Sequence, residues 1–207
     1  MNVGDSVRHS LDEWERQAWD AAMLHACNAV DGTGKKRYPT KGVADRFKST
    51  VRDSLDIYNI LAGAGINYAE TRFPLAVKSD LPDKRPDIAD LLYGIHRCTH
   101  GHGDEMPNGF ELTPYVNNVA LFEGTKDKLR ISASAVLGLL GVAVFAPENK
   151  GKKVPNPGYN LSWAGYVFPI NAWWGWDEHF REVISTDESP RVTLDFGDWW
   201  DGWTPAK

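Results

Sequence analysis

The spacing of apolar residues predicts two long helices in the first third of the chain. The first follows Ser10, a residue that favours a helix N-cap, and extends to Gly32. Its apolar positions recur with helical spacing and are Leu11, Trp14, Ala18, Ala22, Ala26 and Val30. The second helix shows the same period from Val43 to Leu61 and ends before Gly63.

Two further helices are expected in the middle of the chain. Pro86 suits the first turn of a third helix, which carries apolar residues at positions 88, 91, 92 and 95 and ends near Gly101 or Gly103. Gly94 lies on a different face of this helix and would allow another helix to approach. Small and aliphatic residues between positions 131 and 145 predict a buried fourth helix. Together these elements predict a helical bundle.

The remaining segments contain short extended stretches and a tryptophan-rich end. Residues 110–115 predict an extended arm or one strand of a hairpin with residues 119–122. A linker of Gly, Pro and Lys residues divides the chain into a bundle at residues 1–149 and a C-terminal extension at residues 150–207. Most of the tryptophans lie in this extension, where residues 191–196 alternate like a short strand. We expect the extension to pack on the bundle through its tryptophans.

Composition and charge narrow the class of protein. A chain of 207 residues with 42% hydrophobic residues can bury a core without disulfides. Its two cysteines, Cys27 and Cys98, lie inside helical patterns, which favours the reducing cytoplasm. The apolar stretches are too short to span a bilayer and the start lacks the pattern of a secretory signal, so we expect no membrane partner.

The net charge of −5 means that a nucleic acid would have to bind at a local basic patch. Basic residues gather in two links, at residues 32–40 and 150–157, and either group could supply such a patch. These residues are Lys35, Lys36, Arg37, Lys150, Lys152 and Lys153. The sequence leaves open whether either group contacts RNA.

The densest group of polar residues, at positions 95–105, reads IHRCTHGHGDE and lies at the end of the third helix. Within it, Arg97 and His102 suit the cleavage of a phosphodiester without a metal. An imidazole can exchange a proton with a ribose hydroxyl or a leaving oxygen, and a guanidinium offers two donors to phosphate oxygens. Gly101 and Gly103 would let the backbone approach a phosphate closely.

This segment resembles the signature of the HEPN family, an Arg-x4–6-His motif at the end of the third helix of a four- or five-helix bundle. The stretch from Arg97 to His102 matches the motif, and the resemblance extends over residues 11–149. It implies a mainly α fold, a homodimer in which two motifs meet, and a metal-independent endoribonuclease that needs no cofactor. Arg97 would stabilise the phosphorane-like transition state, and His102 would act as general base or acid.

The resemblance also implies a context and supporting residues. Many family members are toxins or phage-defence effectors, which implies RNA as substrate and an antitoxin or another partner protein. Cys98 occupies the position at which family members usually carry Asn, Asp or His. His100 would either assist His102 or act as a cation at the helix end.

Two alternative interpretations stay open. His96 and His100 are four residues apart and could begin a zinc or other transition-metal site. Cys98, His102, Asp104 or Glu105 would complete the site. Alternatively, the chain is a non-catalytic helical module that binds a partner protein through its tryptophan-rich end.

Overall fold

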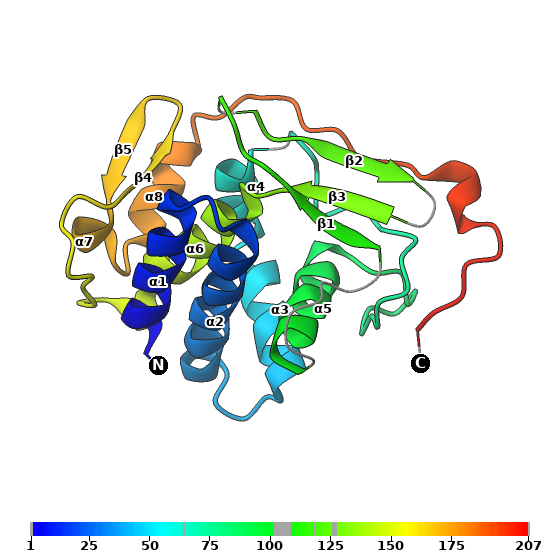
Figure 1. The fold of residues 1–207 in the computed structure, drawn as a ribbon, viewed down its shortest axis with the longest axis horizontal. Coiled ribbons are helices and arrows are strands. Elements are labelled where there is room, and N and C mark those ends of the chain that lie inside the picture. The colour runs from blue at the N-terminus through cyan, green and yellow to red at the C-terminus, as the bar shows by residue number, and fades with distance from the viewer. Residues whose placement is uncertain (1, 64, 102–108, 118, 126–127, 207) are drawn as a thin grey trace.

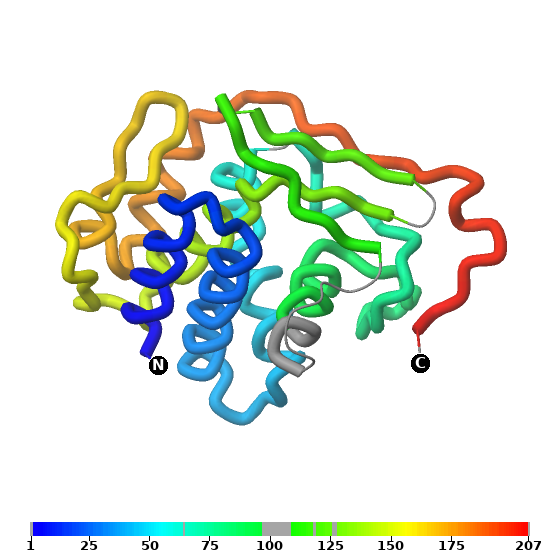
Figure 2. Tube along the Cα trace, viewed as in Figure 1, coloured from blue at the N-terminus to red at the C-terminus, as the bar shows by residue number. Residues whose placement is uncertain are grey.

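The structure is a computed structural model, and it describes residues 2–63, 65–117, 119–125 and 128–206 except for 102–108. For residues 97–101 the description is limited to their membership of a helix. The fold is mainly α, and Figure 1 shows a small sheet lying across one side of the helices. In the trace of Figure 2 the C-terminal segment runs along the top of the molecule, past this sheet, to its far end.

The elements have the following order and bounds. They are α1 (Val3–Glu15), α2 (Trp19–Arg37), α3 (Val43–Asp53), α4 (Leu55–Ala62), α5 (Ile88–Gly101), β1 (Phe110–Thr113), β2 (Phe122–Thr125), β3 (Lys128–Ser132), α6 (Ala135–Phe145), the 3-10 turn η1 (Pro147–Asn149), β4 (Asn160–Trp163), β5 (Tyr166–Pro169), α7 (Ile170–Trp173), α8 (Asp177–Ile184) and the 3-10 turn η2 (Gly197–Trp200).

The first predicted helix is wrong, because the chain forms two helices there. α1 begins at Val3, where Asn2 and Asp5 form a reciprocal capping box. Gln17 has a φ of 59° and lies between α1 and α2, which fold back on each other. Ser10 is not a cap: it is buried within α1, and its hydroxyl donates to the carbonyl oxygen of Ala22 at 2.8 Å. Doubling back gives the apolar face of α1 a partner, which one continuous helix would lack.

The second predicted helix is also divided. Ser54, with φ −121° and ψ 29°, separates α3 from α4. α4 then packs against α6 at the centre of the core. Gly138 of α6 permits this contact, since a Cβ at that position would lie 2.6 Å from Cδ2 of Tyr58. The break at Ser54 therefore allows α4 to reach a partner that a straight continuation of α3 would not meet.

The sheet differs from the predicted hairpin. β3 is its central strand, paired in parallel with β1 and antiparallel with β2, so the strand order is β1-β3-β2. Between these two segments the described residues form a single bridge, from Val116 to Val119, and it lies just after residues 110–115. The two strands expected to form a hairpin, β1 and β2, are therefore separated by β3.

The predicted start of the fourth helix at residue 131 is wrong, because α6 begins at Ala135. Leu129 and Ile131 are buried, whereas Lys128 and Arg130, which precede them in turn, are exposed. This alternation has the period of a half-buried strand, which places the apolar side chains on the core side of β3. The remainder of the prediction is confirmed, since nearly all of α6 is buried.

The tryptophan-rich extension shares the hydrophobic core with the preceding helices. Phe180 of α8 stacks on Phe145 of α6 with ring centroids 4.0 Å apart, and Trp174 is buried. Short strands occur here, since β4 and β5 form an antiparallel hairpin. Residues 191–196 form one isolated bridge, between Val192 and Ile66, instead of the predicted strand. Among the helices in the described ranges, none is long and apolar enough to cross a bilayer.

Candidate functional site

Helix α5 carries Arg97 of the predicted motif, and its first turn is closed by a reciprocal pair of acids. The backbone N–H of Asp90 donates to Oδ1 of Asp87 at 2.9 Å, and the backbone N–H of Asp87 donates to Oδ2 of Asp90 at 3.3 Å. Carboxylates at this position also interact favourably with the positive end of the helix dipole. Pro86 precedes this cap, so it ends the preceding connection rather than entering the helix.

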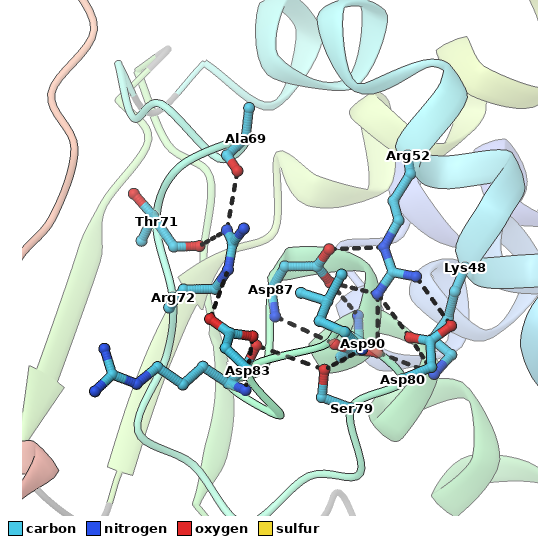
Figure 3. Close-up of polar contacts among 12 residues, drawn as sticks. Lys48, Arg52, Ala69, Thr71, Arg72, Ser79, Asp80, Asp83, Asp87 and Asp90 are labelled. Carbon is cyan, nitrogen blue, oxygen red and sulfur yellow. Dashed lines mark hydrogen bonds and ion pairs between the residues drawn. The ribbon is translucent and has the colours of Figure 1, made fainter.

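The same two acids join α5 to α3 through a cluster of charged side chains, shown in Figure 3. Nζ of Lys48 lies 3.0 Å from Oδ1 of Asp90 and 3.0 Å from Oδ1 of Asp80. Nε of Arg52 lies 2.7 Å from Oδ2 of Asp87, and its Nη2 lies 2.9 Å from Asp80 and 3.1 Å from Asp90. Two cations thus hold three carboxylates that come from α5 and from the connection before it.

The pKa values of Asp90 and Asp80 are shifted in opposite directions. Burial and the neighbouring charge of Asp87 raise the pKa of Asp90 above its ordinary value, although Ser79 and Lys48 oppose the change. Burial would also raise the pKa of Asp80, but hydrogen bonds from Arg52 and Lys48 outweigh it and hold that pKa well below its usual range. Because every carboxylate is engaged by a cation or a backbone N–H, we interpret the cluster as a support for α5 rather than a reactive centre.

Aromatic rings fix the middle of α5 to α3. The imidazole of His96 stacks on Phe47 with centroids 5.2 Å apart and an interplanar angle of 13°. Tyr93 packs against both rings, at 5.7 Å from Phe47 and 6.3 Å from His96. His96 is buried and Phe47 is fully buried, so this layer belongs to the core. Together with the charged cluster it holds α5 along most of its length before the predicted motif.

The prediction that Gly94 admits another helix is wrong. A Cβ at Gly94 would lie 2.6 Å from Cγ1 of Val77, which belongs to the connection between α4 and α5. That connection is itself held in place, since Arg72 donates to the carbonyl oxygens of Ala69 and Thr71 at 2.9 and 3.1 Å (Figure 3). The small residue therefore makes room for an ordered connecting segment.

The predicted catalytic and supporting residues lie at and beyond the end of α5. Arg97, Cys98, His100 and Gly101 belong to its last turns. His102 and Gly103 lie outside the described residues, as do Asp104 and Glu105 of the alternative metal site. The pairing of Arg97 with His102 therefore stays a prediction.

One candidate ligand of the alternative metal site, His96, is buried in the core. The ring of His96 lies against Phe47 and Tyr93 inside the protein, on the side of α5 that faces α3. Within the described part of the chain, no group of three or more His, Cys, Asp or Glu side chains is arranged to hold a metal ion. A site that used both His96 and His100 would require His96 to leave this layer.

The tryptophans of the extension mainly pack against other parts of the fold. Nε1 of Trp203 donates to the carbonyl oxygen of Leu75 at 3.1 Å, and the guanidinium of Arg85 lies 4.6 Å from the ring of Trp200. A Cβ at Gly124 would lie 3.1 Å from the ring of Trp199. Trp176 is 43% exposed, and Nζ of Lys150 lies 5.0 Å from its ring.

Sequence reasoning missed Lys48, Arg52 and Asp80 as partners of α5. The pattern Asp87-x-x-Asp90 before an apolar run is a capping-box signature and could have located the start of the helix. The pairing of these acids with cations 35 to 42 residues earlier has no local signature. It depends on how α3 and α5 pack.

The fold and this anchored helix define a mainly α protein with a candidate reactive segment at the end of α5. The chain belongs to the Rv1289 family, whose model matches residues 2–200. Its relatives include Rv1289 of Mycobacterium tuberculosis strain H37Rv and Mb1320 of Mycobacterium bovis, both named as uncharacterized proteins. Each is 59% identical over 208 residues, covering 100% of this chain and 99% of the relative. No solved structure matches the chain significantly.

Proposed function

We propose that this chain is a metal-independent endoribonuclease of HEPN type in which Arg97 and His102 form the reactive pair. The observation that carries the proposal is that α5 continues through Arg97 to Gly101 and is anchored along its preceding turns by the cluster at Lys48 and the rings at Phe47. A functional side chain on a rigidly supported helix loses little conformational freedom when substrate binds.

The proposed reaction uses the ribose 2′-hydroxyl as nucleophile. His102 accepts the hydroxyl proton while the 2′-oxygen forms a bond to phosphorus, and the bond from phosphorus to the 5′-oxygen breaks. The leaving oxygen takes up a proton, which gives a 2′,3′-cyclic phosphate and a 5′-hydroxyl. Arg97 donates hydrogen bonds to the phosphate oxygens as negative charge builds up on them.

The proposal includes the setting that the resemblance to HEPN proteins implies. The active form is a homodimer in which the ends of two α5 helices approach each other, and it acts on RNA in the cytoplasm. We further propose that the protein acts as a toxin or phage-defence effector and that an antitoxin or another partner protein binds it. The runner-up is a non-catalytic module that binds a partner through the tryptophan-rich extension. In that extension, the side chain of Trp176 is exposed and could contact such a partner.

The test is RNA cleavage by the purified protein in excess EDTA, with analysis of the product ends. Wild type should leave 2′,3′-cyclic phosphate, and Arg97→Ala and His102→Ala should each abolish cleavage with unchanged helicity. His179→Ala is the matched control, because His179 is an exposed histidine of α8. Cleavage retained by both single variants, or lost by wild type only when EDTA is added, would contradict the proposal. No cleavage by wild type would favour the binding module.

A further inference from the structure

Two basic groups that are far apart in sequence meet at the C-terminal end of α2. Arg37 forms a bidentate contact with Glu148 of η1, from Nε to Oε1 at 2.8 Å and from Nη2 to Oε2 at 3.1 Å. Nζ of Lys36 donates to the carbonyl oxygen of Glu148 at 3.1 Å and to Oδ1 of Asn149 at 2.6 Å. The turn that precedes the second basic group is therefore attached to the helix end that carries the first.

The attachment is rigid because Asn149 is fully buried. Its Nδ2 donates to Oγ1 of Thr33 and to the carbonyl oxygen of Ala143, both at 2.8 Å. On the other side of the second group, the backbone N–H of Val154 donates to Oδ1 of Asn171 at 2.7 Å, and Asn171 donates back to Val154 at 2.8 Å. The lysines at positions 150–153 thus lie between two fixed points.

Lysines from the two groups are close enough to influence each other. Burial lowers the pKa of Lys36, and the positive charge of Lys152 lowers it further, against the opposing effect of Glu148. The carboxylate of Glu148 accepts hydrogen bonds from Arg37, whereas Lys36 donates to the backbone carbonyl oxygen of Glu148. Lys35 and Lys153 are exposed, and each is the chain neighbour of one member of this pair. Cations at a helix C-terminus are favoured by its dipole, but this does not account for the lysines of the linker.

We propose that Lys35, Lys36, Lys152 and Lys153 form one surface that binds the phosphate backbone of single-stranded RNA. Like charges held close together repel each other, and a polyanion that binds all of them relieves this repulsion. This inference rests on the proposed function, because cleavage through a 2′-hydroxyl requires a strand free to adopt in-line geometry. Helices α2 and α5 contact each other, and α5 is the helix that contains Arg97. A strand bound at the basic surface would therefore lie on a helix that packs against α5.

The inference is tested by equilibrium binding of a fluorescently labelled 2′-O-methyl RNA, which cannot be cleaved through its 2′ position. The variant Lys35→Ala/Lys152→Ala removes one lysine from each group and leaves the hydrogen bonds of Lys36 intact. At about 0.1 M salt we expect binding to weaken roughly 20-fold, and the slope of log K against log salt to fall in magnitude by about 1.4. Lys78→Ala/Lys128→Ala is the control, since both residues are exposed and lie outside the surface, and it should bind like wild type.

Equal binding by wild type and the Lys35→Ala/Lys152→Ala variant, or equal weakening in the control, would overturn the inference. A second arm uses vesicles of phosphatidylserine and phosphatidylcholine, and binding to these without binding to RNA would also overturn it. The two proposals fail separately. Lysine-dependent binding with no cleavage of ordinary RNA would reject the proposed reaction and support the RNA-binding surface. Cleavage that is insensitive to these lysines would support the reaction and reject the surface.

Discussion

Lys48 of α3 and Asp90 of α5 form an ion pair of 3.0 Å whose side chains are only 5% and 0% exposed. A buried pair of this kind is costly to desolvate, and loss of Asp90 would leave Lys48 with the half-exposed Asp80 as its remaining counter-ion. Because Asp90 also closes the first turn of α5, one side chain determines both where the helix starts and what it packs against.

Replacing Asp90 should therefore be strongly destabilising. We expect Asp90→Asn to lower the free energy of unfolding by about 1 to 3 kcal/mol, because Lys48 would lose its fully buried counter-ion and keep only Asp80. Asp83→Asn is the control, since Asp83 is half exposed and lies 4.0 Å from Arg72, and it should change stability by less than about 1 kcal/mol. Urea unfolding followed by circular dichroism measures both. Coincident unfolding curves for the two variants would show that the pair does not stabilise the fold.

Acid should weaken the attachment of η1 to α2. Burial opposes ionisation of Glu148, but hydrogen bonds from Arg37 outweigh it and lower the pKa of Glu148 below its ordinary value of 4.5. A depressed folded-state pKa contributes stability above the ordinary value, and this contribution is lost as the pH falls below it. Wild type should thus be more stable than Glu148→Gln at pH 7, with the difference shrinking below about pH 4.5. Urea titrations at several pH values measure this difference, and a constant gap would contradict the assignment.

The contact between α4 and α6 should not tolerate a methyl group at Gly138. In Gly138→Ala the added Cβ would lie 2.6 Å from the ring of Tyr58 and 3.0 Å from its carbonyl oxygen, so backbone must move. We expect a loss of about 1 to 3 kcal/mol, the usual cost of overpacking a core. In the control Gly42→Ala, the atom nearest to the new Cβ is Oδ2 of Asp45, at 3.8 Å. Thermal unfolding should separate the two variants, and equal midpoints would disprove the close packing.

The proposed assembly predicts a dimer that carries two motifs. Sedimentation equilibrium should give twice the mass of the 23.1 kDa chain at micromolar concentration, for wild type and for His102→Ala alike. Mixing inactive Arg97→Ala subunits into wild type should lower the activity per wild-type subunit, because mixed dimers contain an incomplete pair of motifs. A monomer with full activity would exclude this part of the proposal.

The helices that sequence patterns located well are those with one dominant face. α5 was predicted because its aliphatic stripe has helical period and follows Pro86, and most of α6 because it is almost wholly apolar. The breaks at Gln17 and Ser54 were missed because neither is a typical helix-breaking residue. The breaks instead allow α1 to pack against α2 and α4 to pack against α6. β3 was assigned to a helix because only five residues carry its alternating pattern, next to a long apolar run.

The sequence by itself determined the chemistry that is available: the spacing of Arg97 and His102, the helix that leads to them, and two basic groups in separate links. These are local patterns, and side-chain periodicity and residue type are enough to express them. The tertiary structure alone decided that Lys48 and Arg52 neutralise the acids of α5 and that Lys36 lies beside the turn leading to Lys152. Such contacts join residues about 30 to 110 positions apart, and they exist only because packing of the core brings their helices together.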